Sequence, residues 1–281
     1  MRRSPPAAEP GWTEHRPSRG WRSQLDLRDA WRHRELTWFL ALRDVRLRYR
    51  QTAFGVAWAL IQPLAGVAIF TLVFSRVSGI EHGHVPYFVF AYTAMILWTY
   101  TSTSVEGAAR SLIEDRSLVE RVYFPRILAP AAALLPGLLD LGISLVILAI
   151  LMAIFAVSVP ATALLLPLLL LVALTVSFGV GLWLAALNVQ YRDVRYALTF
   201  GLQLAFFATP VVYPSSLVRG AWRWVYSANP LVGVIDGTRW AVLDLAPPPA
   251  ADAISLVAAS VILVTGLMYF YATQRRFADV I

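Results

Sequence analysis

The sequence predicts an all-α integral membrane protein, in which six transmembrane helices follow an amphipathic interfacial helix and short re-entrant helices precede the last span. Three observations predict this class. The 281 residues are 58% hydrophobic and 15% charged, whereas roughly a quarter of the residues of a soluble domain are charged. The apolar residues gather in long blocks, which is typical of membrane-spanning helices. The basic residues are all arginine, and they concentrate at the ends of these blocks.

The N-terminal part of the chain is polar. Residues 1–24 are rich in proline, arginine and serine without apolar periodicity, so we expect a disordered cytoplasmic tail and no signal peptide. Residues 25–51 predict an amphipathic helix in the headgroup plane, because apolar side chains recur on one face and arginines fall mainly on the other. The alternative is a soluble amphipathic helix packed on another domain. The apolar face holds Trp31, Trp38, Leu42, Val45 and Tyr49.

Residues 52–281 are expected to form the six-span domain. The first apolar segment has 23 uncharged residues, which gives about 35 Å of helix and suffices to cross a bilayer with some tilt. The third segment is longer than one crossing needs and contains Pro130, Pro136 and the acid Asp140. The expected spans are residues 53–75, 86–105, 127–157, 161–187, 196–212 and 253–271.

The arginine distribution predicts the orientation. The segments before span one, between spans two and three, between spans four and five, and after span six hold 12, 4, 2 and 2 of the 24 arginines. An excess of arginine marks the cytoplasmic side, so both termini are expected in the cytoplasm and the chain in the cytoplasmic (inner) membrane. The net charge of +7 therefore follows from topology, and we expect no nucleic-acid partner. The remaining arginines are Arg76, Arg219, Arg223 and Arg239.

The outer segment of about residues 214–250 is too charged to cross and is broken by Asn229-Pro230 and Gly237. We expect short re-entrant helices here; an ordinary outer loop with two amphipathic turns is the alternative. Asp236 and Arg239 stand three residues apart, a spacing that permits an ion pair on a helix. We expect this pair to steady the re-entrant hairpin.

Several chemistries are disfavoured. A phosphate-binding loop needs a lysine, and the chain has none, so ATP must be hydrolysed by a separate subunit if it drives this protein. No catalytic constellation can be assembled from the spans, so we expect no enzyme. His82 and His84, with Glu81, lie on one loop, and we expect them to be solvated and to bind no metal. Asp140 is the one clear ionisable candidate inside the spans for a proton-coupled carrier.

Several ordered motifs carry a resemblance to a known family. A basic and aromatic helix leads into Phe54-Gly55-Val56-Ala57-Trp58 and then Gln62-Pro63. Further along come Thr209-Pro210-Val211-Val212-Tyr213-Pro214, Asn229-Pro230, Asp236 and Arg239. From about Arg43 to Ile281 the chain resembles the permeases of type-2 ABC exporters of the O-antigen, capsular polysaccharide and teichoic acid class. It departs from their pattern in Phe54 for leucine, Thr209 for serine and Asp236 for glutamate.

The resemblance implies a homodimer that pairs with two copies of a cytoplasmic ABC ATPase and passes a lipid-linked glycan between its two chains. ATP and Mg would belong to the ATPase, and this chain would hold no cofactor. The cytoplasmic loops at about residues 106–126 and 188–196 would dock on the ATPase, although the second could be a topogenic turn whose arginines only enforce orientation. The candidate coupling residues are Glu114, Asp115, Arg116, Glu120, Arg121, Arg192, Asp193 and Arg195.

Three further sets of residues are candidates on this interpretation. The interfacial helix, in contact with membrane lipids, would shape the substrate entrance with Trp38, Arg43, Arg46, Tyr49 and Arg50. A sugar polymer needs a wet and weakly adhesive path, for which the candidates are Trp58, Tyr87, Tyr92, Trp98 and Tyr100; each could instead belong to the interfacial aromatic belt or pack between helices. The outer gate would contain Asn229, Asp236 and Arg239.

Two alternative functions stay open at the level of sequence. The first is a type-2 ABC permease for drugs or small lipids, which shares the six-span plan. The second is the proton-coupled carrier that uses Asp140. The sequence does not identify the glycan, its lipid carrier or the envelope type.

Overall fold

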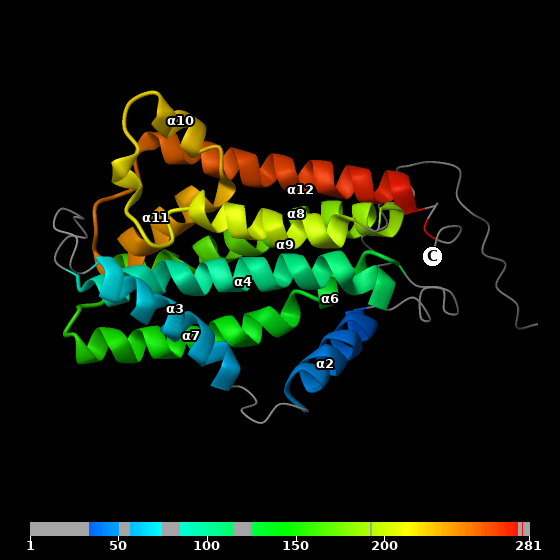
Figure 1. Ribbon diagram of the computed structural model, residues 1–281, viewed down its shortest axis with the longest axis horizontal. Coiled ribbons are helices and arrows are strands. Elements are labelled where there is room, and N and C mark those ends of the chain that lie inside the picture. The colour runs from blue at the N-terminus through cyan, green and yellow to red at the C-terminus, as the bar shows by residue number, and fades with distance from the viewer. Residues whose placement is uncertain are drawn as a thin grey trace, which may run out of the picture.

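The computed structural model describes residues 34–50, 57–74, 85–114, 125–191, 193–274 and 277 of the chain (Figure 1). All regular elements in these ranges are helical. The predicted tail and the first part of the predicted interfacial helix lie outside them. The α-helices are α2 (Arg34–Arg50), α3 (Ala57–Phe74), α4 (Tyr87–Glu114), α6 (Leu128–Ala132), α7 (Leu135–Ile154), α8 (Leu166–Gln190), α9 (Val194–Phe207), α10 (Trp222–Tyr226), α11 (Pro230–Leu243) and α12 (Ala253–Thr273). Short 3-10 turns are η2 (Ala161–Leu165), η3 (Ser215–Leu217) and η4 (Ala250–Asp252).

Among the described residues, three helical segments are long and apolar enough to cross a membrane. They are Leu128–Ile154, Ala161–Gln190 and Ala250–Thr273, with 27, 30 and 24 residues. Two shorter apolar helices, Leu60–Phe74 and Val194–Phe207, accompany them. The described part of the chain is therefore an all-helical structure of the kind that integral membrane proteins have.

The long helices lie side by side along the long axis of the molecule, with α2 near one end and α10 and α11 at the other (Figure 1). Helix α4 is the centre of this arrangement, since it packs against α3, α7, α8, α9 and α11. Its apolar residues are nearly all buried. It also extends through Glu114, so the first part of the loop predicted at residues 106–126 is helical and continues α4.

Proline breaks the third apolar segment into α6 and α7. Pro136 stands at the second position of α7 and lacks a backbone N–H, so the helical hydrogen-bond ladder is interrupted just before it. Residues 133 and 134 form a turn at this point. The apolar segment expected at residues 127–157 is thus mostly helical, but as two helices in series.

Helices α8 and α12 approach each other closely at two glycines. A Cβ atom on Gly266 would lie 2.5 Å from the backbone oxygen of Gly179, and one on Gly179 would lie 2.8 Å from Cα of Leu263. Both distances are shorter than side chains tolerate, so only glycine permits this contact. Small residues at helix interfaces are a general means of helix association in membranes.

Helix α2 docks on α6 and α7 near the end of the molecule opposite α10. Its docked face consists of Leu40 and Ala41, which are buried together with Ala132 of α6. Trp38 is 64% exposed, while Arg43 and Arg46 are also exposed. Helix α2 therefore has a docked face, an exposed aromatic face and an exposed arginine face, whereas the sequence pattern predicted only an apolar face and a basic face.

Candidate functional site

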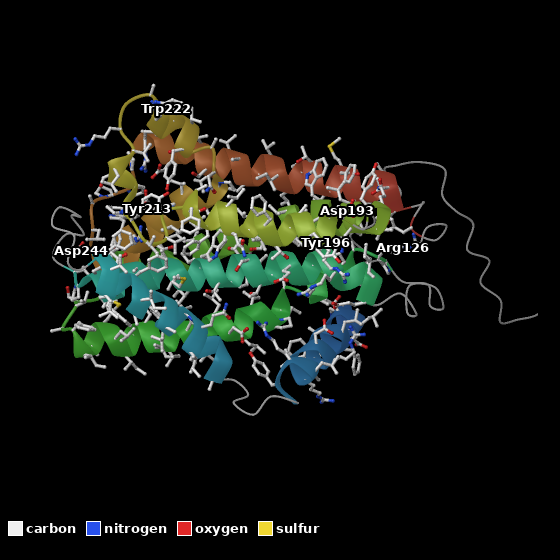
Figure 2. The ribbon with its side chains drawn as sticks, in the orientation of Figure 1. Arg126, Asp193, Tyr196, Tyr213, Trp222 and Asp244 are labelled. Carbon is white, nitrogen blue, oxygen red and sulfur yellow. The ribbon has the colours of Figure 1, made fainter. Side chains whose placement is uncertain are left out.

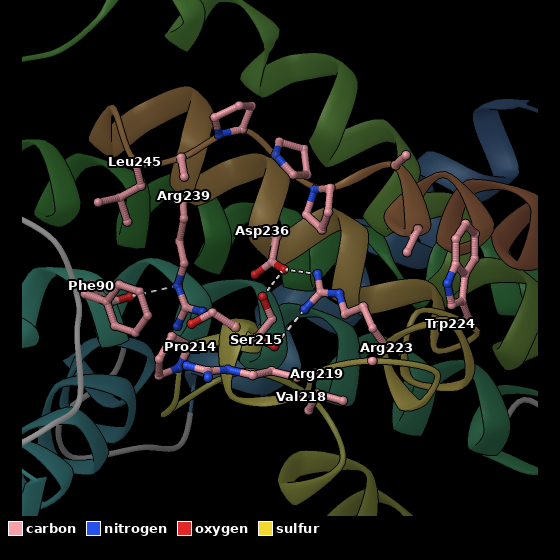
Figure 3. Close-up of a pocket in the computed structure, with 18 residues that line it drawn as sticks. Phe90, Pro214, Ser215, Val218, Arg219, Arg223, Trp224, Asp236, Arg239 and Leu245 are labelled. Carbon is pink, nitrogen blue, oxygen red and sulfur yellow. Dashed lines mark hydrogen bonds and ion pairs between the residues drawn. The ribbon is translucent and has the colours of Figure 1, made fainter.

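A buried ion-pair cluster closes the α10–α11 end of the molecule, the end at which α10, α11 and η4 meet. Arg223 of α10 lies 2.9 Å from Asp236 of α11 and 2.7 Å from Asp252 of η4. The side chains are 11%, 11% and 4% exposed, respectively. Ser215 donates to Asp236, and Ser227 donates to Asp252 over 2.8 Å. One guanidinium group therefore joins three elements that are distant in sequence, and Figure 3 shows its contact with Asp236.

The predicted ion pair of Asp236 with Arg239 is wrong. No salt bridge joins these two residues among those that the structure describes, and Asp236 pairs with Arg223 instead. Burial raises the pKa of Asp236, and the hydrogen bonds from Ser215 and Arg223 and the charge of Arg239 offset only part of this rise. These partners favour the ionised form of the carboxylate, against the desolvation that opposes it.

Arg239 instead holds the irregular segment that follows α9. Its Nη2 donates to the carbonyl oxygen of Val211 over 2.8 Å, and its guanidinium lies 3.6 Å from the ring centroid of Phe90. Tyr87 donates to the carbonyl oxygen of Val212 over 2.6 Å. Burial lowers the pKa of Arg239 to about 10, so the group remains a cation at neutral pH. These donors satisfy carbonyl groups that have no helical partner, which a buried non-helical backbone requires.

Asn229 begins α11 and fastens it to α9. Its side-chain oxygen accepts a hydrogen bond from the backbone N–H of Leu231, as a helix N-cap does. Its Nδ2 donates to Ala208 and to the hydroxyl of Thr209, over 3.2 and 2.9 Å. Pro230 fits the first helical position, where no N–H is needed. The two motifs of the sequence, Thr209 to Pro214 and Asn229-Pro230, thus meet in space.

Asp140 has a partner that the sequence did not indicate. Its carboxylate lies 2.9 Å from Nη1 of Arg48, and the hydroxyl of Tyr49 donates to it. Burial, followed by the hydrogen bond to Asp140, raises the pKa of Tyr49 to about 12, so the tyrosine is a neutral donor. Asp140 therefore ties α2 to α7. This pairing gives the carboxylate a structural role, and it leaves the proton-carrier hypothesis without support from the geometry.

Four of the predicted path aromatics are buried inside the chain. Their exposed fractions are 9% or less. Tyr92 donates weakly to the carbonyl oxygen of Ser144 over 3.4 Å, and Trp98 meets Phe206 edge-to-face with centroids 5.6 Å apart. In this conformation they pack helices together, so the prediction that they line an open path is not met by a single chain. These residues are Tyr87, Tyr92, Trp98 and Tyr100; the side chain of Trp58 is outside the described residues.

The described coupling candidates lie at the end opposite α10. Glu114 ends α4, and Asp193 stands immediately before α9, with its side chain exposed and without a helix-capping hydrogen bond. Asn188 donates to the carbonyl oxygen of Ala109 over 2.7 Å, which joins α8 to α4 near this end. Arg195 is exposed and lies 5.9 Å from the ring centroid of Tyr196. Figure 2 shows Asp193 and Tyr196 at this end, away from Tyr213 and Trp222. Asp115, Arg116, Glu120, Arg121 and Arg192 lie outside the described residues.

The candidate residues for the substrate entrance are also only partly among the described residues. Trp38, Arg43 and Arg46 are exposed on α2, whereas Tyr49 is turned to Asp140. The side chain of Arg50 is outside the description, as are His82 and His84. Within the described ranges, no three acidic, histidine or cysteine residues are grouped so as to hold a metal ion.

Arg223, Asp252 and Arg48 were not among the functional residues predicted from the sequence. The sequence marked Arg223 only as one of four outer arginines, although it is the single basic residue of the short stretch WRWVY. Asp252 is an isolated acid at the start of the last apolar segment. The sequence shows Arg223 and Asp252 as isolated charges near apolar segments, but the fold was needed to identify their partners.

Comparisons with known proteins cover most of the chain. The family described as ABC-2 type transporter matches residues 35–243. The chain is 28% identical over 252 residues to the O-antigen export system permease protein RfbA of Myxococcus xanthus, which is 89% of this chain and 96% of that protein. It is 24% identical over 242 residues to the protein of the same name from Klebsiella pneumoniae, covering 85% and 92%. These relatives are permeases by name, and the similarity extends over nearly their whole length.

Proposed function

Because the chain belongs to the ABC-2 type transporter family, we propose that it is the permease subunit of an ATP-driven exporter of a lipid-linked polysaccharide. The observation that carries the proposal is the similarity to two bacterial permeases named for O-antigen export, which spans 92% or more of their length. The chain would move its substrate from the cytoplasmic side of the membrane and would not itself be an enzyme.

The proposed topology has six crossings, with both termini in the cytoplasm. Three segments meet the length and hydropathy that a crossing needs, and α3, α4 and α9 would supply the others. Helix α4 is 28 residues long, enough to cross, and its hydroxyl-bearing and aromatic side chains are shielded from lipid by its neighbours. In this topology the α10–α11 end faces outward, and α2 lies at the cytoplasmic surface.

The proposed assembly contains two copies of this chain and two copies of a cytoplasmic ATPase that binds ATP and Mg. The absence of lysine from the chain supports a separate ATPase, because a phosphate-binding loop depends on lysine. The end of α4 and the turn before α9 present exposed charges at one end of the molecule. Charged groups of this kind orient a partner more than they add affinity.

In the proposed mechanism, movement of the ATPase against the end of α4 and the turn before α9 is transmitted to the spans. ATP-driven closure of the ATPase pair would displace the end of α4 and the turn before α9. The hydrogen bond from Asn188 to Ala109 links α8, which leads into this turn, to the last part of α4. The two permease copies would then separate enough for the glycan to pass between them. Helix α2 would border the entrance, held in place by the contact of Arg48 and Tyr49 with Asp140.

Depletion of the protein in its native cells tests the proposal. Lipid-linked glycan in the cytoplasmic membrane and glycan at the cell surface are measured after expression is stopped, with a plasmid-borne wild-type copy as the control. Loss at the surface together with build-up in the membrane supports the proposal. Unchanged amounts in both pools contradict it.

A further inference from the structure

A cavity lies beside the Arg223 cluster and is not used by any step proposed above. It has a volume of about 730 Å³ and is bordered by the η3–α10 turn, α11 and the segment of residues 245–251 (Figure 3). Sites for small molecules and cofactors fall in the range of roughly 300–1,000 Å³. The cavity is therefore large enough to hold a ligand of one or a few sugar rings.

The polar groups at this cavity include both donors and acceptors without partners. Arg219 lines the cavity, is exposed, and forms no salt bridge with any residue that the structure describes. The Nε–H of Arg223 is buried and finds no acceptor in the described part of the chain. Asp236 uses Oδ2 for both Ser215 and Arg223, whereas no hydrogen bond from a described residue reaches its Oδ1. The exposed hydroxyl of Ser216 can both donate and accept.

The remaining lining is apolar and partly aromatic. The ring of Trp224 borders the cavity and is 56% exposed, and Pro247 and Pro248 line another part of it. An exposed indole ring offers a flat face for the C–H side of a sugar while its N–H stays available for hydrogen bonding. Trp222 is 74% exposed on the same helix but does not line the cavity.

The charge balance discriminates between ligand classes. Three guanidinium groups, those of Arg219, Arg223 and Arg239, stand against the carboxylates of Asp236 and Asp252, which leaves one net positive charge. The net charge alone would admit a phosphate group, but an ionised phosphate only accepts hydrogen bonds and has no donor for the Oδ1 of Asp236. A sugar ring carries hydroxyls that donate to a carboxylate and accept from a guanidinium, so it matches both kinds of free group.

We propose that this cavity is a saccharide-binding subsite, which takes a sugar unit of the exported glycan at the α10–α11 end with Trp224 as the stacking face and Arg219 and Asp236 as polar partners. The inference rests on the proposed function, since the sugar is that of the exported glycan. Arg219 and Ser216 are solvent-exposed, so we expect binding weak enough to let a polymer slide.

The test uses the full chain in lipid nanodiscs and oligosaccharides released by mild acid from the surface glycan of the native cells. Saturation-transfer NMR measures binding. We expect Trp224→Ala and Arg219→Gln each to weaken binding by about tenfold, as removal of an interface anchor does. Trp222→Ala is the matched control, because it removes an exposed indole two positions earlier on the same helix that does not line the cavity, and it should bind as the wild type does.

The outcomes separate this inference from the proposed function. Wild-type protein that fails to bind the oligosaccharides, or Trp224→Ala and Arg219→Gln proteins that bind as tightly as the Trp222→Ala control, overturn the subsite. If glycerol 3-phosphate competes for the cavity as strongly as the oligosaccharide does, the saccharide subsite is overturned in favour of a site for a headgroup phosphate. If depletion nevertheless causes lipid-linked glycan to build up, the exporter stands and only the subsite is lost. If depletion changes no glycan pool, the proposed function itself has failed.

Discussion

Replacement of Arg223 by methionine should destabilise the protein more than any substitution of an exposed arginine. The guanidinium group is 11% exposed and lies 2.9 and 2.7 Å from two carboxylates that are themselves buried. Removing one partner of a buried ion pair costs about 3–5 kcal/mol, because it leaves an uncompensated buried charge. Here two carboxylates lose the salt-bridge partner that they share, and only Asp236 keeps the nearby charge of Arg239, so we expect a loss in free energy of unfolding at the upper end of that range.

The assay is a titration of the detergent-solubilised protein with SDS, followed by far-UV circular dichroism. Arg219→Met is the matched control: it removes an exposed arginine four positions earlier, and such surface changes usually stay within about 0.5 kcal/mol. A second variant, Arg223→Met with Asp236→Asn and Asp252→Asn, removes all three charges and should recover part of the loss. Equal stability of Arg223→Met and Arg219→Met would refute the reasoning, and so would a triple variant less stable than Arg223→Met.

Three further predictions concern the rest of the molecule. Asp140→Asn should change the free energy of unfolding by less than about 1 kcal/mol, because Asp140 pairs with an arginine that is 40% exposed. Surface glycan should stay near the wild-type amount. Complete loss of export by an inserted Asp140→Asn protein would favour the proton carrier instead. Gly266→Ala should cost about 1–3 kcal/mol in the SDS titration, since its Cβ would meet the Gly179 oxygen at 2.5 Å. Gly142→Ala, which meets nothing within 4 Å, is its control, and equal effects of the two would show that the α8–α12 contact is not critical. The Asp193→Arg protein should insert normally, but ATP hydrolysis should be uncoupled from export in the purified complex. Full export by the inserted variant would count against the proposed contact of Asp193 with the ATPase.

Much of the fold could be predicted from local sequence. The apolar blocks, Pro136 and the Asn229-Pro230 pair are local signals, since helix length, helix breaks and helix caps depend on a few neighbouring residues. The expected apolar segments accordingly correspond to helices, apart from shifted ends such as the extension of α4 to Glu114. The short helices before the last apolar segment are also present, as α10 and α11.

The contacts of the charged residues could not be predicted in the same way. Spacing along a helix suggested a pair of Asp236 with Arg239, but Asp236 binds Arg223, 13 positions away. Asp140 pairs with Arg48 across 92 positions. A buried charge takes the partner that the packed helices bring within reach, and that proximity has no counterpart in a local pattern.

The sequence by itself determined that the chain is helical, rich enough in apolar segments for a membrane, and without the lysine that ATP binding by a phosphate loop requires. It also contained the motifs by which the family is recognised. Only the tertiary structure decided that one arginine joins η3, α10, α11 and η4, that Asp140 fastens α2, and that a cavity with free donors and acceptors lies beside the cluster. The physical reason is that composition and periodicity fix how each segment meets its solvent, whereas ion pairs and cavities depend on which segments lie together after packing.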